Sequence, residues 1–244
     1  MLVKSQVKYI QSLGQKKSRD ESGAFIAEGP KIVSELLQEI PGRVQQVLGL
    51  KEWLTDHEKL LNGIAAIEVS PAELEKISQL QTPNQVIAVV RKFEQVTEVK
   101  LKGKLVLALD TLQDPGNLGT IIRIADWFGI EYIICDHDSA DLYNPKVVQA
   151  TMGSIARVKL LYTDLAGWLA EQKTTIYAAA LDGEDITTMQ KPAEGIIVIG
   201  NESKGISPDI LKVVTKKITI PQKGKAESLN AAVATGIILS HLAT

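Results

Sequence analysis

The feature that most constrains the fold is a regular alternation of apolar runs and helical patterns after residue 104. The runs at 105–110 (LVLALD), 132–136 (YIICD) and 195–199 (GIIVI) are almost entirely apolar. Between the first two runs, 118–129 (LGTIIRIADWFG) carries apolar residues at helical spacing. Strands that are apolar along their whole length are buried on both faces, and strands separated by helices run parallel. The sequence therefore predicts an α/β domain built on a parallel sheet.

A smaller α/β module precedes this domain. Gly29-Pro30 introduces a helical period, and 85–93 (QVIAVVRKF) has the composition of a strand. The next stretch, 94–104 (EQVTEVKLKGK), is polar, has no sustained apolar pattern and is typical of a linker. We predict three parts: an N-terminal module over 1–98, a linker over 99–103 and a C-terminal domain over 104–244.

The composition predicts a soluble cytoplasmic protein. Hydrophobic residues make up 45% of the chain and charged residues 23%, which is typical of globular domains. No apolar run approaches the ~20 residues that a membrane span needs, and the first twenty residues lack the features of a signal peptide. The single cysteine, Cys135, lies in an apolar run, so we expect a buried thiol rather than a reactive one.

The charge is distributed unevenly. The net charge of −2 argues against wholesale coating of nucleic acid. However, five basic residues and no acidic residue precede Asp20, and four more lysines gather near the C-terminus. Any one such cluster is usually a solvated face, so the two clusters leave local phosphate binding open without establishing it.

Three loops follow predicted strands and carry polar side chains. They are 111–117 (TLQDPGN), 200–205 (GNESKG) and 220–230 (IPQKGKAESLN). Ligands of parallel α/β sheets bind in loops at the carboxyl ends of the strands. We therefore expect the functional site where these loops meet.

Familiar nucleotide and metal motifs are absent from these loops. No GxGxxG follows the first strand, and Ile206 stands where a phosphate-binding loop needs its lysine. The three histidines are isolated from one another and from Cys135, so a zinc site or a Cys-His pair has little support. No GxSxG elbow occurs.

Each loop also has a purely structural interpretation. Asn117 and Ser228 could cap helices, and Glu202 could cap the helix that begins near Ser207 or be solvated. Arg123 is harder to explain in this way. Its neighbours are isoleucines and alanine, which favour burial, and a buried guanidinium needs an anionic partner.

Taken together, the three loops resemble the motifs of the SpoU-type RNA ribose 2′-O-methyltransferases, which belong to the knotted SPOUT superfamily. The matching blocks are NLGTIIR (117–123), VIGNESKG (198–205) and IPQKGKAESLNAA (220–232). Their order and spacing make the resemblance specific, and it covers residues 104–244. Gln222 and Ala231 replace a methionine and a valine of many members, which affects packing and removes no essential chemical group.

The resemblance implies a fold, a reaction and partners. The C-terminal domain would contain a trefoil knot and use S-adenosylmethionine (AdoMet), without a metal, to methylate a ribose 2′-hydroxyl. The N-terminal module, whose stretch GAFIAEGPKIVSELL is similar to the family's RNA-binding module, favours ribosomal over transfer RNA as substrate. A homodimer through the C-terminal domain would form. Two alternatives stay open: a methyltransferase that acts on a base, and a non-catalytic RNA-binding protein of the same fold.

The resemblance also assigns roles to residues. A guanidinium almost never deprotonates, so Arg123 would stabilise charge on the ribose oxygen or position a phosphate, and Asn117 would orient Arg123 or the ribose. The candidate catalytic residues are Arg123, Asn117, Glu202, Ser228 and Asn230. The candidate AdoMet-binding residues are Gly200, Asn201, Gly205, Ile220, Pro221, Leu229 and Asn230. The candidate RNA-binding residues are Lys4, Lys8, Lys16, Lys17 and Arg19.

Overall fold

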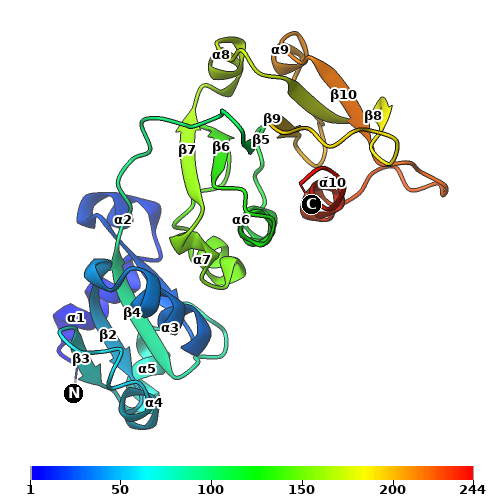
Figure 1. Cartoon of the computed structure of the whole chain (residues 1–244). Coiled ribbons are helices and arrows are strands. Elements are labelled where there is room, and N and C mark those ends of the chain that lie inside the picture. Colours follow the sequence, from blue (N-terminus) through cyan, green and yellow to red (C-terminus); the bar gives the residue numbers. More distant parts are fainter. Residues whose placement is uncertain (1, 244) are drawn as a thin grey trace. The chain divides into compact units, whose positions relative to one another are not determined.

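The chain folds into two units, each with its own sheet (Figure 1). The computed structural model describes residues 2–243. The first unit contains the chain up to Glu94 together with Asp141–Ala156. The second unit contains Gln95–Ala140 and the chain from Arg157 onward. Within residues 2–243, no helix has the combination of length and apolarity that a membrane crossing requires.

The second unit contains a six-stranded parallel sheet in the order β10-β8-β9-β5-β6-β7. The strands are β5 (Leu105–Leu109), β6 (Tyr132–Asp136), β7 (Lys159–Thr163), β8 (Ile176–Asp185), β9 (Gly195–Ile199) and β10 (Lys216–Thr219). The helices are α6 (Pro115–Trp127), α8 (Leu165–Ala170), α9 (Pro208–Leu211) and α10 (Ala231–Leu242). The predicted α/β fold with a parallel sheet is therefore confirmed.

The centre of this sheet forms the core of the second unit. β9 is buried along its whole length, and β5 is buried from its second residue onward. Cys135 in β6 is fully buried, as expected, and burial raises the pKa of its thiol. Because the middle strands are covered on both faces, polar side chains are displaced to the loops at the strand ends.

The pairing of β8 with β10 is irregular. Lys217 pairs with Ala178, whereas the next residue, Ile218, pairs with Glu184. Gly183 makes this possible, because a Cβ atom there would lie 2.5 Å from the backbone of Ile218. The trefoil knot that the resemblance implies stays a prediction.

The first unit contains a four-stranded mixed sheet in the order β1-β4-β2-β3. β4 runs antiparallel to β1 and β2, and β2 runs parallel to β3. The strands are β1 (Ala24–Glu28), β2 (Val44–Gly49), β3 (Ala65–Glu68) and β4 (Val86–Arg91). The helices are α1 (Lys4–Ser12), α2 (Lys16–Ser22), α3 (Pro30–Glu39), α4 (Lys51–Asp56) and α5 (Pro71–Ile77), with a 3-10 turn at Pro41–Arg43.

Strands β1 and β3 were not predicted from the sequence. The five residues of β1 are all buried and run directly into the turn before α3, so their apolar residues look like part of the helical pattern. β3 has only four residues and is mostly exposed, so it lacks the apolar run that marks a strand.

A segment between β6 and β7 completes the first unit. It contains α7 (Pro145–Thr151) and a 3-10 turn at Ser154–Ala156. The ring of Tyr143 packs against Phe25 in β1, with 5.0 Å between the ring centroids, and its hydroxyl accepts a hydrogen bond from the backbone N–H of Phe93. The N-terminal module predicted from the sequence is one continuous stretch, 1–98, whereas the first unit is built from two separate stretches of the chain.

Candidate functional site

The three predicted loops meet in the second unit around a pocket of about 530 Å³. This volume lies within the range of about 300–1,000 Å³ that is typical of small-molecule sites. The lining is strongly polar, with carboxylate, amide, hydroxyl and ammonium groups. The lining residues are Gln113, Asp114, Asn117, Asn201, Glu202, Ser203, Lys204 and Asn230.

A chain of hydrogen bonds joins one residue from each loop. The Nδ2 atom of Asn117 donates to Oε1 of Glu202 over 2.7 Å. The Nδ2 atom of Asn230 donates to Oδ1 of Asn117 over 2.8 Å. Asn117 thus uses both ends of its amide, which fixes the orientation of the side chain.

Helix α6 delivers Asn117 to this position. Pro115 is the first residue of the helix, and the carboxylate of Asp114 accepts a hydrogen bond from the backbone N–H of Asn117 over 2.7 Å. Asp114 is therefore the N-cap, and Asn117 is not. Because the backbone is capped by another residue, the amide of Asn117 is available for Glu202 and Asn230.

The third loop ends at the start of α10. Asn230 is the N-cap of this helix, with its Oδ1 atom accepting hydrogen bonds from the N–H groups of Ala232 and Val233. The structural interpretation considered for Ser228 thus belongs to Asn230, which caps the helix and contacts Asn117 at the same time. Since the cap fixes the side chain, the amide nitrogen points toward a defined partner.

The loop after β9 is closed by its own backbone. Asn201 and Gly205 exchange two backbone hydrogen bonds, and the side-chain oxygen of Asn201 accepts from the N–H of Ser203. Gly205 has φ +69°, and a Cβ atom on Gly200 would lie 2.4 Å from the carbonyl carbon of Gly205. The loop can therefore adopt this shape only with glycine at its start.

The other AdoMet-binding candidates lie nearby, but outside this pocket. Asn201 and Asn230 line the pocket, whereas the remaining candidates do not. Ile220 is half-buried, and the whole stretch 221–230 is exposed, with Leu229 at 48%. The AdoMet-binding candidates outside the pocket are Gly200, Gly205, Ile220, Pro221 and Leu229, and the catalytic candidate Ser228 also lies outside it.

Arg123 is exposed, so the prediction of a buried guanidinium is wrong. It follows Asn117 by six positions, which turns it by about 120° around the helix and moves it about 9 Å along the axis. It lies instead on an exposed stripe with Thr120 and Trp127, and Trp127 is 84% exposed. Among residues 2–243, Arg123 has no hydrogen-bond or ion-pair partner, and it does not line the pocket.

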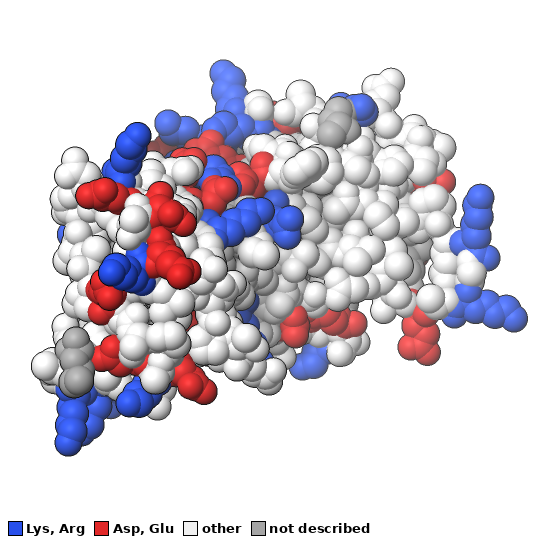
Figure 2. All heavy atoms as spheres, turned by 90° about the horizontal axis from the view of Figure 1, so that it is seen from below, with Lys and Arg blue, Asp and Glu red and all other residues white. Residues whose placement is uncertain are grey.

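Four of the five RNA-binding candidates are exposed lysines on the first two helices. Lys4 and Lys8 lie on α1, and Lys16 and Lys17 lie on α2. On the face drawn in Figure 2, basic side chains are interspersed with acidic ones and form no continuous basic band. Binding of RNA would then depend on local groups of lysines and on shape.

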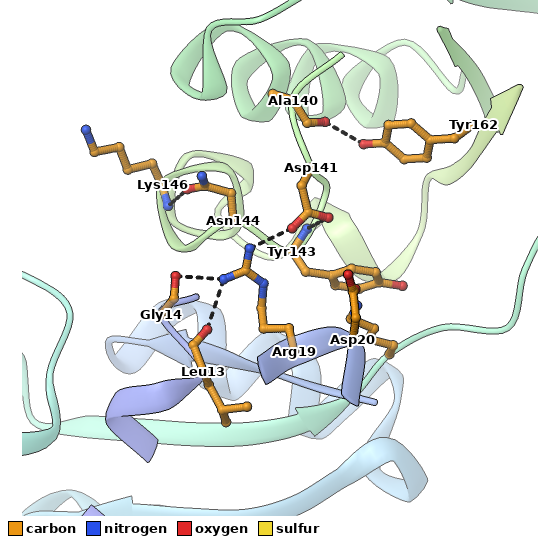
Figure 3. Close-up of polar contacts among 11 residues, drawn as sticks. Leu13, Gly14, Arg19, Asp20, Ala140, Asp141, Tyr143, Asn144, Lys146 and Tyr162 are labelled. Atoms are coloured by element: carbon orange, nitrogen blue, oxygen red, sulfur yellow. Dashed lines mark hydrogen bonds and ion pairs between the residues drawn. The ribbon is translucent and has the colours of Figure 1, made fainter. Parts of the chain in front are cut away.

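Arg19 is buried, so its assignment to an RNA-binding surface does not fit the structure. It is only 2% exposed, and Nη2 donates to Oδ2 of Asp141 over 2.7 Å (Figure 3). Nη1 donates to the carbonyl oxygens of Leu13 and Gly14 at the end of α1. The guanidinium is thus committed to internal partners and cannot contact a phosphate.

Two polar residues of the region were missed by the sequence analysis. The Asp114-Pro115 pair is a common helix start, and this signal could have identified the cap. Asp110 follows β5 and is only 4% exposed, but nothing in the sequence distinguishes it from the other acids at strand ends. Within residues 2–243, no group of three His, Cys, Asp or Glu side chains is arranged to hold a metal ion.

Comparison with known families decides what kind of site this is. Residues 104–240 match the SpoU rRNA Methylase family, and residues 4–88 match the MRM3-like substrate binding domain. The chain belongs to the SpoU rRNA methylase family. The resemblance inferred from the three motifs is thus confirmed.

Two relatives match this chain over almost its whole length. The 23S rRNA (guanosine(2553)-2′-O)-methyltransferase RlmP of Bacillus subtilis is 31% identical over 240 residues, which is 97% of this chain and 95% of the relative. The SpoU methyltransferase AviRb from Streptomyces viridochromogenes, solved with the cofactor AdoMet, superimposes with a TM-score of 0.85 at 25% identity. That match covers 99% of this chain and 97% of AviRb.

A second AdoMet-bound relative gives the same result. The rRNA methyltransferase from Sinorhizobium meliloti matches with a TM-score of 0.83 and 30% identity over 99% of this chain and 95% of its own. Homologues of this protein thus include named 2′-O-methyltransferases of 23S rRNA, and AdoMet is the cofactor in the two solved relatives that contain it.

Proposed function

We propose that the protein transfers a methyl group from AdoMet to a ribose 2′-hydroxyl of ribosomal RNA. The observation that carries this proposal is the hydrogen-bonded chain of Glu202, Asn117 and Asn230, which joins the three motif loops around one pocket. The names of the full-length relatives support rRNA as the substrate class. The match of residues 4–88 to a substrate binding domain supports a role for the first unit in holding the RNA.

The loops around the pocket fit AdoMet. Leu229 is 48% exposed and Ile220 is half-buried, so the loop after β10 offers apolar side chains that the core does not use. Such side chains suit an adenine ring, and the backbone of 200–205 offers hydrogen-bonding groups for its edge and for the ribose. When bound, AdoMet supplies a methyl group on a positively charged sulfur.

The chain's own polar groups prepare the hydroxyl that receives the methyl group. A hydroxyl is a weak nucleophile until its proton leaves, and negative charge then grows on the oxygen. Glu202 uses Oε1 for Asn117, so that its second oxygen can accept a hydrogen bond from the ribose hydroxyl. Since Asn230 holds the other end of the Asn117 amide, this carboxylate is oriented before the substrate arrives.

A homodimer through the second unit is part of the proposal. Helices α6 and α10 pack on each other and still expose large apolar side chains, Trp127 at 84% and Val233 at 51%. Arg123 lies on the same exposed stripe as Trp127, away from the pocket of its own chain. In a dimer joined by this surface, Arg123 completes the pocket of the other copy.

Methyl transfer to unmodified ribosomal RNA, with transfer RNA alongside, tests the proposed function. Labelled methyl from AdoMet should appear in an alkali-resistant dinucleotide, because a methylated 2′-oxygen cannot attack the neighbouring phosphate. Label in a base, with normal alkaline cleavage, would favour a base methyltransferase. Binding of RNA without any transfer would favour a non-catalytic RNA-binding protein.

A further inference from the structure

Asp110 is a buried acid beside the pocket that the proposed reaction does not use. It directly follows β5 and is 4% exposed. Its Oδ2 atom accepts the backbone N–H of Ser207 over 2.6 Å, and Oδ1 accepts the hydroxyl of Thr111 over 3.1 Å. Among residues 2–243 it has no ion-pair partner. Burying a carboxylate without a cation costs free energy, and the two hydrogen bonds offset only part of this cost. The burial of Asp110 therefore needs an explanation.

The residue after Asp110 is held in a strained conformation. Thr111 has φ +54°, a region that a β-branched residue enters only when its surroundings force it. The carbonyl oxygen of Thr111 accepts a hydrogen bond from Nδ2 of Asn201 over 2.8 Å. The strained backbone thus turns this carbonyl toward the loop after β9.

Asp110 and Thr111 tether the two ends of that loop. Asn201 stands at its start and Ser207 at its end, and backbone hydrogen bonds between Asn201 and Gly205 close it in between. Glu202 lies inside the closed stretch and faces Asn117. The position of the Glu202 carboxylate therefore depends on two contacts to the end of β5.

We propose that Asp110 is a positioning residue that holds 200–207 in the shape that binds AdoMet and keeps Glu202 against Asn117. This inference rests on the proposed function of the pocket. Both oxygens of the carboxylate accept a hydrogen bond here, whereas an amide keeps the bond from the N–H of Ser207 only if its NH₂ group faces the hydroxyl of Thr111, which can also accept. Asp110 touches neither substrate nor cofactor in this scheme and acts through Ser207.

The test compares Asp110→Ala and Asp110→Asn with a matched control, Asp136→Ala. Asp136 ends the neighbouring strand β6, and its carboxylate accepts the N–H of Asp138 in a different loop. AdoMet affinity is measured by titration calorimetry, and kcat and the KM for RNA by methyl transfer. Asp110→Ala should weaken AdoMet binding about ten- to hundredfold and lower kcat, with the KM for RNA within about twofold.

Partial recovery in Asp110→Asn and wild-type behaviour in Asp136→Ala would support the positioning role. A folded Asp110→Ala protein with wild-type AdoMet affinity and kcat would overturn it. If Asp110→Ala does not fold, Ser207→Pro removes the N–H that Asp110 accepts, at a φ of −62° that proline adopts, and should weaken AdoMet binding in the same way; wild-type binding there would overturn the proposal. Failure of the proposed function has a different signature, since the wild-type protein would then transfer no methyl group to RNA.

Discussion

The guanidinium of Arg19 lies 2.7 Å from the carboxylate of Asp141, although 122 positions separate the two residues in the chain. The exposed fractions of the two side chains are 3% and 18%, so this ion pair is largely withdrawn from water. It links the end of α1 to the segment that precedes α7, both within the first unit.

Breaking this ion pair should destabilise the protein strongly. Asp141→Asn leaves a buried cation without its charge partner, which typically costs about 3–5 kcal/mol. Urea unfolding followed by circular dichroism measures the free energy of unfolding. Glu94→Gln is the control, because Glu94 is 92% exposed in its pair with Arg43 and should contribute less than about 1 kcal/mol. Equal effects of the two substitutions would contradict the assignment of Arg19 to the core.

Replacement of Asn117 should impair catalysis more than folding. Asn117→Ala removes the group that orients Glu202 and contacts Asn230, and we expect kcat to fall about a hundredfold, as when one preorganised donor is removed from an active site. Single-turnover methyl transfer measures the rate, and thermal unfolding checks the fold. Asn62→Ala, at an exposed position of the first unit, should behave like the wild type. A fully active Asn117→Ala protein would rule out the hydrogen-bonded chain as part of the machinery.

The exposed surface of α6 should hold two copies of the chain together. Trp127→Glu places a charge where a large apolar side chain is 84% exposed. The dissociation constant of the dimer should therefore rise at least about tenfold relative to the wild type. Sedimentation velocity at several concentrations measures this. Leu211→Glu, on α9 of the same unit, is the control, because Leu211 is 38% exposed and lies outside the proposed interface. A wild-type protein that is monomeric at all concentrations would refute the dimer.

A mixing experiment asks whether the two copies share their sites. Arg123→Ala and Asn117→Ala should each be nearly inactive when assayed alone. If Arg123 acts on the pocket of the other copy, a mixture in which the subunits exchange should regain roughly a quarter of the wild-type activity, because half of the dimers then carry one intact site. Mixtures that stay inactive, with exchange verified, would place Arg123 in the site of its own chain.

The stability of the protein should decrease at low pH because the carboxyl group of Glu131 becomes protonated. Hydrogen bonds from Lys104 and Lys159 lower the pKa of its carboxyl from the usual 4.5 to about 2. Because the pKa is lower in the folded state, this contribution to stability is complete above about pH 4.5 and disappears as the pH falls toward 2. The difference in Tm between the wild type and Glu131→Gln should therefore shrink over that range. A difference that is constant from pH 7 to pH 2 would show that the carboxyl is not coupled to the lysines.

The sequence was sufficient for the features that depend on local pattern. Apolar strands alternating with helices predicted the parallel sheet. Because loops at the carboxyl ends of parallel strands lie close together, the sequence also predicted that the loops carrying Asn117, Glu202 and Asn230 meet, and the structure shows these residues hydrogen-bonded. The features that it did not predict depend on geometry beyond the local pattern. The exposure of Arg123 follows from its phase on α6, whose buried face passes through Ile121 and Ile122 instead.

Arg19 illustrates the limit most clearly. It stands in the charged stretch KKSRDES, where nothing in the neighbouring residues separates it from the exposed Lys16 and Lys17. Its burial is decided by Asp141, which arrives from another part of the chain. A contact of that range cannot be found from a pattern in a single sequence.

The first unit also has a consequence for how the protein is made. Residues up to Glu94 leave the ribosome well before Asp141 and Tyr143, and translation at about 5–20 residues per second puts on the order of ten seconds between Arg19 and its partner. During that interval Arg19 and Phe25 lack the groups that cover them in the finished fold. Release of a chain truncated before α7 would therefore yield an N-terminal half that is still open and exposed to proteases.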